Sequence, residues 1–331
     1  VSLSPISKPV SQTPKEVIGF VPYWNLDSIN ETSLAQTTTI YYFGVSLNPD
    51  GSINKKDPGW LWLNSQKFND LAALVKKHNL RFGLTIVNLD PNIRPSTDSI
   101  LKLLRDYGFI DLNLDLEYTG DSNEILKKDF HGLITDIADG VRKEIPGSKV
   151  TVDMLADGVT NPRLVDAKTI SESVDKIIIM EYDFNRLNAI SAGPVAPLPA
   201  VLTSINSYLE NVPPEKLILG IPFYGYEWPT LDNQKNSFVI KSSRGPELST
   251  YKRSVQTAQE NNASINFDDT SKSVWFSYYD SKDQSWRQVW FENERSLSYK
   301  AELVSQFHLA GTAIFALGYE GSFDLLSKLN F

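Results

Sequence analysis

The most regular run in the sequence is Phe109-Ile110-Asp111-Leu112-Asn113-Leu114-Asp115-Leu116-Glu117. Polar and apolar residues alternate along it, which is typical of a β-strand because successive side chains point to opposite faces. The polar face holds three carboxylic acids and one carboxamide: Asp111, Asn113, Asp115 and Glu117. Neighbours two apart lie about 6.6 Å from each other, so each acid raises the cost of ionising the next. A solvated edge strand usually carries Lys, Thr or mixed charges, so this pattern favours acid–base chemistry over a structural role.

Composition narrows the class of protein and the chemistry available to it. The chain has 331 residues, enough for one large α/β domain or two ordinary ones. A formal charge of −8 without a Lys/Arg run argues against nucleic acid or an anionic membrane as the main partner. No stretch approaches the roughly 20 apolar residues that a membrane-spanning helix needs. Cysteine is absent and the three histidines are scattered, so we expect no metal site and no cofactor, and carboxylates and tyrosines remain as candidate groups.

Strand-like and helix-like runs alternate along the chain. The strand-like runs span residues 17–23, 38–45, 80–88, 109–117, 150–154, 175–182, 216–222 and 311–317. The helix-like runs span residues 66–78, 96–107, 124–145, 162–173, 197–211, 296–308 and 322–329. Such alternation indicates a parallel sheet with right-handed crossovers, and eight strands predict an α/β fold of the (β/α)8 TIM-barrel type. A doubly wound open sheet is the alternative, which the lack of a glycine-rich phosphate loop after the first strand disfavours.

The sequence divides into an arm, a barrel and an insertion. Residues 1–16 are rich in Ser, Pro and Thr and show no apolar period, which predicts a flexible arm. Residues 226–290 hold mixed polar residues and turn signals, which predict an inserted α+β subdomain between the seventh and eighth strands. The catalytic barrel then comprises residues 17–225 and 291–331. We expect a monomer that is secreted or held in the cell envelope, with no export signal in this chain.

In a barrel of this type the active site lies at the C-terminal ends of the strands. Glu117 ends the fourth strand and is predicted at the mouth, with Asp115 one layer below. Asp111 is predicted near the closed bottom, where a buried carboxylate needs a partner. The same alternation points Arg81 of the third strand inward, so we hypothesise an Arg81–Asp111 pair with a structural role.

Six segments, taken in order, resemble glycoside hydrolase family 18, the chitinase-like barrels. They are VIGFVPYW (17–24), IYYFGV (40–45), FIDLNLDLE (109–117), MEYDF (180–184), LILGIPFYGY (217–226) and GTAIFALGYE (311–320). The third resembles the acidic DxxDxDxE strand of the family, and the fourth resembles its MxYDF strand end. The subgroup with the most similar features is bacterial and includes proteins that act on cell-wall or spore peptidoglycan.

The resemblance implies a mechanism and a set of site residues. The 2-acetamido oxygen of the substrate would attack the anomeric carbon, so that hydrolysis retains configuration without a protein nucleophile. Glu117 would protonate the glycosidic oxygen and then activate water, Asp115 would orient the acetamido N–H, and Tyr182 would donate a hydrogen bond to the acetamido carbonyl. The implied partner is a polysaccharide or oligosaccharide that contains N-acetylglucosamine. The implied substrate-binding residues are Asp183, Met180, Phe315, Asn113, Phe20, Phe43, Tyr224 and Trp228.

The sequence departs from the family pattern at several positions. Asn113 stands where the family has its central aspartate. An amide cannot share a proton with Asp115 as a carboxylate would, so we expect Asp115 to be easier to ionise. Ile110 takes the place of the first aspartate of the motif. Phe20 and Phe315 replace a tyrosine and a tryptophan of the −1 subsite, and a phenyl floor offers less face than an indole.

The leading interpretation is hydrolysis of β-1,4 bonds next to N-acetylglucosamine in chitin or chito-oligosaccharides. The same chemistry on peptidoglycan or spore cortex is the first alternative. A chitinase-like protein that binds carbohydrate without cleaving it is the second, although such members usually lose the catalytic glutamate and Glu117 is present. The third is an unrelated barrel enzyme that uses Asp115 and Glu117 as a carboxylate pair.

Overall fold

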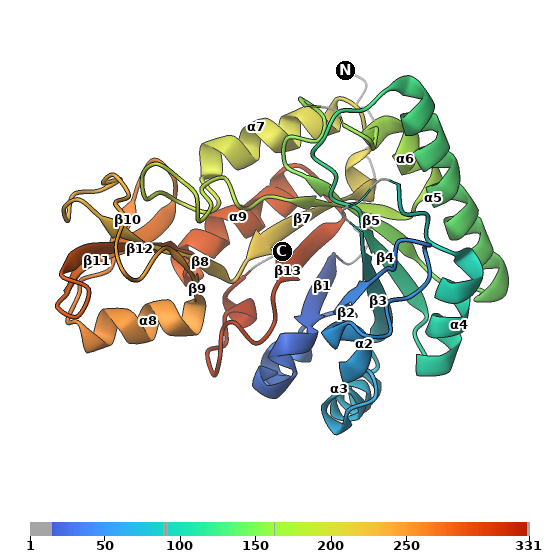
Figure 1. The fold of residues 1–331 in the computed structure, drawn as a ribbon, viewed down its shortest axis with the longest axis horizontal. Helices are drawn as coiled ribbons and strands as arrows, with labels where there is room; N and C mark the ends of the chain where they lie inside the picture. The colour runs from blue at the N-terminus through green and yellow to red at the C-terminus, as the bar shows by residue number, and fades with distance from the viewer. Residues whose placement is uncertain (1–14, 89, 91, 162, 330–331) are drawn as a thin grey trace, which may run out of the picture.

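The computed structural model describes residues 15–88, 90, 92–161 and 163–329. Eight parallel strands close into a barrel in the order β1-β13-β7-β6-β5-β4-β3-β2 (Figure 1). Their bounds are β1 (Glu16–Pro22), β2 (Thr39–Ser46), β3 (Arg81–Val87), β4 (Asp111–Asp115), β5 (Val150–Leu155), β6 (Lys176–Met180), β7 (Leu217–Pro222) and β13 (Gly311–Phe315). The predicted (β/α)8 barrel is confirmed, and the alternative of an open sheet is wrong because β1 pairs with both β2 and β13.

Helices connect the strands around the outside of the barrel. They are α1 (Glu31–Leu34), α2 (Pro58–Trp62), α3 (Gln66–Lys77), α4 (Thr97–Tyr107), α5 (Glu124–Glu144), α6 (Ala167–Ser173), α7 (Leu198–Leu209), α9 (Glu294–Gln306) and the 3-10 helices η1 (Tyr23–Ser28), η2 (Pro214–Lys216) and η3 (Leu326–Lys328). Local caps set their ends: the Ser96 side chain accepts the Ser99 N–H before α4, and Gly108 ends α4 with a φ of 73°.

Two predicted helices differ from the structure. The helix expected over residues 162–173 begins only at Ala167, because the Asp166 side chain accepts the Thr169 N–H and caps the chain there; Pro162 lies outside the described residues. The helix expected over residues 322–329 is reduced to the short η3. Neither change affects the order of the barrel strands.

The inner face of the barrel carries a layer of apolar side chains and, on β4, a row of polar side chains. The apolar layer consists of Ile18, Phe20, Tyr41, Ile178, Ile218 and Ala313. A Cβ atom at Gly83 would lie 2.3 Å from the Tyr41 ring, so glycine at this position leaves room for that ring inside the barrel. The alternate residues of β4, such as Leu112 and Leu114, face outward into the main core. Alternation along β4 therefore puts its acids inside the barrel.

The Arg81–Asp111 pair is confirmed. Arg81 Nε donates to Asp111 Oδ2 at 2.7 Å, and Arg81 Nη2 donates to Oδ1 at 2.5 Å. The Lys149 N–H also donates to Asp111 Oδ1, at 2.7 Å. Asp111 is fully buried and begins β4. The pair therefore closes the N-terminal end of the barrel, away from the mouth.

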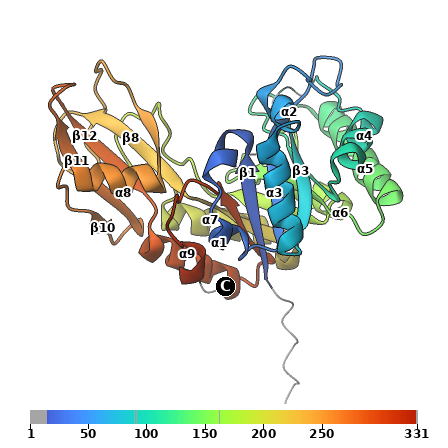
Figure 2. The ribbon, with the colours of Figure 1, turned by 90° about the horizontal axis from the view of Figure 1, so that it is seen from below.

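A five-stranded antiparallel sheet follows β7 and stands beside the barrel (Figures 1 and 2). Its elements are β8 (Tyr224–Thr230), β9 (Glu247–Thr250), α8 (Tyr251–Glu260), β10 (Asn266–Asp268), β11 (Ser273–Asp280) and β12 (Ser285–Phe291). This confirms the expected α+β insertion between the seventh and eighth barrel strands. The sheet already begins at Tyr224, whereas the predicted insertion starts at residue 226.

A buried carboxylate ties the strands of the insertion together. Glu227 on β8 is fully buried, and its Oε1 accepts hydrogen bonds from Arg287 Nε, from Arg244 Nη2 at 2.5 Å and from the Tyr278 hydroxyl at 2.6 Å. Arg253 Nη2 donates to Oε2 at 3.1 Å. The four donors come from β12, β11, α8 and the loop before β9, so they fix the insertion as one unit.

The predicted arm ends earlier than expected. Residues 1–14 lie outside the described residues. Glu16, which the prediction assigns to the arm, is the first residue of β1, and its N–H donates to the Ala310 carbonyl at 3.0 Å. Lys15 Nζ donates to the Leu309 carbonyl at 2.6 Å. None of the helices in the described ranges has both the length and the apolar character that crossing a membrane requires.

Candidate active site

Three carboxyl groups meet at the C-terminal ends of β4 and β5. Asp115 pairs in register with Asp153 on β5, and the two side chains are 3% and 6% exposed. Glu117 follows two residues after the end of β4 and is half-buried. It borders a small cavity of about 30 Å³ together with Asp153, and a cleft of about 390 Å³ together with Tyr182 and Asp183. Among the described residues, no group of three or more His, Cys, Asp or Glu side chains forms a metal-binding arrangement.

Sequence analysis missed Asp153. Its strand Val150–Leu155 has the sequence VTVDML, in which one acid stands among apolar residues. That acid sits in a fully packed part of the sheet, and an isolated buried carboxyl is costly unless it is neutral or bonded. The signal was therefore present in the sequence, although it is a single residue rather than a repeated pattern.

Asn113 is directed toward β5. Its Nδ2 donates to Asp153 Oδ1 at 2.7 Å and to Thr151 Oγ1 at 3.0 Å. The Thr151 hydroxyl in turn donates to the Tyr41 hydroxyl at 3.3 Å. Asn113 Oδ1 and Asp115 Oδ1 are both buried and have no hydrogen-bond partner among the described residues. The amide therefore stabilises Asp153 rather than Asp115.

Burial and mutual repulsion hold protons on these carboxyls. Burial raises the pKa of Asp115 well above its ordinary value, and the neighbouring Asp153 and Glu117 raise it further. Burial raises the pKa of Asp153 to about 8, against the lowering effect of the Asn113 hydrogen bond. Burial also raises the pKa of Glu117, which a nearby arginine partly offsets. The pKa of Asp115 is thus raised although residue 113 is an amide, first by burial and second by Asp153, which restores the like charge that Asn113 lacks.

The end of β6 supplies the opposite wall. Met180 is the last residue of β6, with its side chain 7% exposed, and Tyr182 and Asp183 follow it. Asp183 has a φ of 62°, and its Oδ1 accepts hydrogen bonds from the Tyr224 hydroxyl at 2.7 Å and the Tyr226 hydroxyl at 2.8 Å. The two tyrosines of the insertion therefore fix the orientation of the Asp183 carboxylate at the edge of the cleft.

Aromatic rings form a continuous group around Phe315, the last residue of β13. The centroid of its ring lies 5.1 Å from that of Phe43, 6.0 Å from Phe20, 6.1 Å from Tyr182 and 6.3 Å from Tyr224. Phe315 and Phe43 are partly exposed, whereas Phe20 is 2% exposed and lies beneath them. The structure thus brings five predicted site residues from distant parts of the chain into one aromatic surface.

Trp228 does not reach this surface. Its side chain is fully buried in the insertion, and its Nε1 donates to the Arg186 carbonyl at 3.2 Å. A fully buried indole has no face to offer a ligand, so the structure contradicts the direct substrate contact predicted for Trp228. Arg186 is exposed, lines the cleft, and donates from its Nε to the Asp183 carbonyl at 3.2 Å. Trp228 therefore supports the loop that carries Arg186, a cleft residue that sequence analysis missed.

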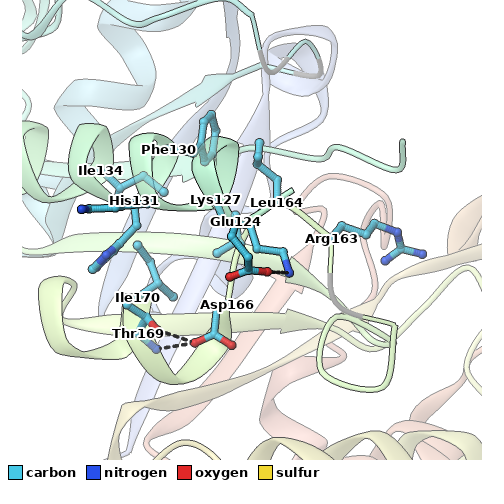
Figure 3. A pocket seen from close by; sticks show the side chains of 12 residues that line it. Glu124, Lys127, Phe130, His131, Ile134, Arg163, Leu164, Asp166, Thr169 and Ile170 are labelled. Atoms are coloured by element: carbon cyan, nitrogen blue, oxygen red, sulfur yellow. Dashed lines mark hydrogen bonds and ion pairs between the residues drawn. The ribbon is translucent and has the colours of Figure 1, made fainter. Parts of the chain in front are cut away.

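A second cavity lies beside the cleft, between α5 and the loop that leads into α6 (Figure 3). Its volume is about 400 Å³, and its wall carries the Lys127–Glu124 ion pair, with Nζ and Oε1 2.9 Å apart. Arg163 borders both this cavity and the cleft, and its guanidinium donates two hydrogen bonds to Asp157, at 2.7 and 2.8 Å. The residues that border this cavity include none of the predicted site residues.

Two known proteins are similar to this chain in sequence. The cortical fragment-lytic enzyme of Bacillus subtilis (strain 168) is 25% identical over 262 residues, which cover 77% of this chain and 55% of that protein. The di-N-acetylchitobiase of Rattus norvegicus is 28% identical over 220 residues, covering 60% of this chain and 58% of that protein. The chain therefore spans less than two thirds of the length of either relative.

Solved structures show the same fold. A GH18 chitinase from Cycas revoluta, solved in complex with (GlcNAc)3, superimposes with a TM-score of 0.79 at 21% identity, covering 95% of this chain and 98% of that one. The model of the family described as glycosyl hydrolases family 18 matches residues 16–320, which include all the barrel strands and the insertion. The chain therefore belongs to glycosyl hydrolases family 18.

Proposed function

We propose that this protein is a retaining glycoside hydrolase that cleaves β-1,4 bonds next to N-acetylglucosamine in chitin or chito-oligosaccharides. The observation that carries the proposal is the position of Glu117. It stands beyond the end of β4, half-buried, at the junction of the cleft and the buried carboxyls. Burial raises its pKa, which favours the protonated form that a general acid needs.

The reaction proceeds in two steps. In the first, the Glu117 proton passes to the glycosidic oxygen while the acetamido oxygen of the −1 sugar bonds to the anomeric carbon, and the C–O bond to the leaving sugar breaks. Asp115 accepts the acetamido N–H and offsets the positive charge that develops. In the second step Glu117, now a carboxylate, removes a proton from water as the water oxygen bonds to the anomeric carbon and the acetamido oxygen departs. Two inversions at one carbon retain its configuration.

The remaining site residues position the substrate. The Tyr182 hydroxyl donates to the acetamido carbonyl oxygen and so directs it at the anomeric carbon. Its pKa is raised by burial first and by the surrounding acids second, so it stays a neutral donor. Asp183 accepts hydrogen bonds from sugar hydroxyls with its orientation fixed by two tyrosines. Phe315 and Phe43 supply the flat apolar surface on which the −1 sugar stacks.

Peptidoglycan glycan strands are a second candidate substrate, and one feature of the cleft favours them. Arg186 is exposed on the cleft wall, and Arg163 lines it as well. Peptidoglycan strands carry carboxylates where chitin carries only neutral groups, and guanidinium groups suit carboxylates. The name of the Bacillus subtilis relative, a cortical fragment-lytic enzyme, points the same way. Either substrate places the site of action outside the cytoplasm, in the cell envelope or the medium.

The test is to incubate the wild-type protein and Glu117→Gln with chito-oligosaccharides and with peptidoglycan strands, and to measure released reducing ends. We expect the variant to lose about 10²- to 10⁴-fold in kcat, because the amide has no proton to donate. Glu124→Gln is the matched control, since Glu124 begins α5 with its side chain 89% exposed, and it should keep full activity. The glycan that the wild type cleaves faster identifies the substrate class.

Three outcomes would contradict the proposal. Equal release by the wild type and Glu117→Gln would remove the glutamate from the chemistry. Tight binding of either glycan with no cleavage by the wild type would identify a carbohydrate-binding protein. A thiazoline that mimics the cyclised acetamido intermediate should bind tightly, and failure to bind would indicate an unrelated barrel enzyme that uses Asp115 and Glu117 as a carboxylate pair.

A further inference from the structure

We propose that Asp153 is a positioning residue of this active site, which supplies from β5 the second carboxyl beside Asp115 that Asn113 does not supply from β4. The inference rests on the proposed function, because it assigns a role within the same reaction. It concerns a residue that lies beside Asp115 and accepts a hydrogen bond from Asn113, and that does not touch the reacting atoms. Its effect is to decide where one proton lies when the substrate binds.

The register of the sheet places the two acids side by side. Asp115 and Asp153 are direct partners in the parallel β4–β5 ladder, where neighbouring strands lie about 4.8 Å apart. The Asn113 amide, on the inner face of β4, reaches both Thr151 and Asp153, so these β5 side chains also point inside the barrel. The carboxyls of Asp115 and Asp153 are therefore held side by side on one face, both almost completely buried.

The hydrogen-bond pattern distinguishes the two acids. Asp153 Oδ1 accepts a hydrogen bond from Asn113 Nδ2 at 2.7 Å, and such a bond stabilises a carboxylate. Asp115 Oδ1 is buried with no donor among the described residues. A buried carboxylate without a donor is the costlier place for the negative charge. Asp153 is therefore the first of the two to ionise, as its pKa of about 8 is passed, and the remaining proton then resides on Asp115.

The described surroundings of the pair carry no positive charge bonded to it. In the described part of the chain, no Lys or Arg side chain forms a hydrogen bond or ion pair with Asp115 or Asp153, so only a proton can neutralise them. The ionisable groups that interact with the pair from neighbouring elements are Tyr41 on β2, Glu117 after β4 and Tyr182 after β6, whereas Asp183 and Arg186 act on Glu117. Both tyrosines have a raised pKa, mainly from burial, and remain neutral.

Once Asp153 has ionised, the two acids exchange one proton as the substrate binds. The acetamido N–H brings to Asp115 the donor that it lacks, which favours the carboxylate form at that residue. The proton leaves Asp115 for the second oxygen of Asp153, and one negative charge moves in the opposite direction. The number of protons bound by the site therefore does not change. Asp115 thereby becomes an anion beside the developing positive charge without releasing a proton to solvent.

The test compares Asp153→Asn with the double variant Asn113→Asp/Asp153→Asn, in which the second carboxyl returns to β4. An asparagine at residue 153 keeps the size of the side chain and can donate to Asn113 Oδ1, which has no partner, so a structural role would be preserved. We expect Asp153→Asn to lower kcat about tenfold or more with little change in KM, and to shift a limb of the pH–rate profile by about one unit. The double variant should recover most of the lost kcat, because the effects of substitutions at neighbouring residues are not additive. Asp139→Asn, exposed on α5, is the matched control.

Two results would overturn the inference. One is an Asp153→Asn protein with wild-type kcat and an unchanged pH profile. The other is a double variant no more active than Asp153→Asn although it unfolds at the same urea concentration. If the wild type cleaves neither glycan, the proposed function fails by itself. Whether Asp153 is held protonated in the folded protein is then decided by the pH dependence of unfolding, where parallel curves for the wild type and Asp153→Asn reject it.

Discussion

The buried carboxyls make the stability of this protein depend on pH, and replacing Asp153 by Asn should change that dependence in a known direction. Burial raises the pKa of Asp153 from 3.8 to about 8 in the folded protein. In the unfolded chain the same carboxyl returns to its ordinary value. Between these two pKa values the folded state therefore binds a proton that the unfolded state has released.

The sign and the size follow from proton linkage. The free energy of unfolding changes with pH in proportion to the protons bound in the unfolded state minus those bound in the folded state. For Asp153 this difference is negative, so its contribution falls as pH rises from 3.8 to about 8 and is constant outside that window. A difference of one bound proton changes the free energy of unfolding by about 1.4 kcal/mol per pH unit. The contribution of Asp153 to the free energy of unfolding therefore falls by about 3 kcal/mol between about pH 5 and about pH 7. An asparagine at residue 153 cannot titrate, so its contribution to the free energy of unfolding does not depend on pH.

The assay is urea unfolding at a series of pH values, followed by far-ultraviolet circular dichroism, for the wild type and Asp153→Asn. Glu320, whose pKa burial raises to about 7, titrates in the same window, but it does so in both proteins and cancels in the difference. We expect the stability of Asp153→Asn relative to the wild type to rise by about 3 kcal/mol across those two pH units. Curves that run parallel would refute the reasoning, because Asp153 would then hold no extra proton in the folded state.

Three further substitutions test the subsite floor and the closed end of the barrel. Phe315→Trp, made in the inactive Glu117→Gln protein, should tighten chito-oligosaccharide binding by about 2- to 10-fold in a fluorescence titration, because indole adds stacking area; unchanged affinity would place Phe315 outside the subsite. Arg81→Met should lower the free energy of unfolding by about 3–5 kcal/mol, because it leaves the fully buried Asp111 carboxylate with only the Lys149 N–H as donor. Asp111→Asn should cost less, since the Arg81 side chain is 32% exposed and can regain water, and equal costs in urea unfolding would contradict this.

The barrel was predictable because its signals are periodic and repeated. Strict alternation over residues 109–117 places Asp111 and Asp115 on one face, and the same alternation in β3 predicts the partner Arg81. Each inference needs only the period of a strand and the parallel order of the sheet. The errors lie where a single local contact decides the outcome. The Asp166 cap starts α6 several residues later than its apolar pattern indicates, and η3 is too short to show a helical period.

The candidate site was predictable where the resemblance supplied a motif and unpredictable where the insertion intervened. Asp183 belongs to a quoted motif, but the hydroxyl of Tyr226 that holds it comes from the antiparallel sheet. Trp228 was misplaced for a related reason: β8 is buried on both faces, and the Trp228 indole lies under the loop that carries Arg186, to whose carbonyl it donates, rather than in the cleft. Arg186 carries no signal in the sequence beyond its charge.

Asp153 was missed because sequence spacing measures distance along a strand, whereas the closest acid lies across the sheet. Residues two apart on one strand are separated by about 6.6 Å, but register partners on adjacent parallel strands are separated by about 4.8 Å. Asp153 is therefore nearer to Asp115 than residue 113 is, and it is the charge that most raises the pKa of Asp115. A carboxyl can thus leave the β4 motif and still act on the same neighbour, provided that it reappears at the register partner. The Asn113 amide, which donates to Asp153 at 2.7 Å, is consistent with such an exchange, because it stabilises the new carboxylate from the old position.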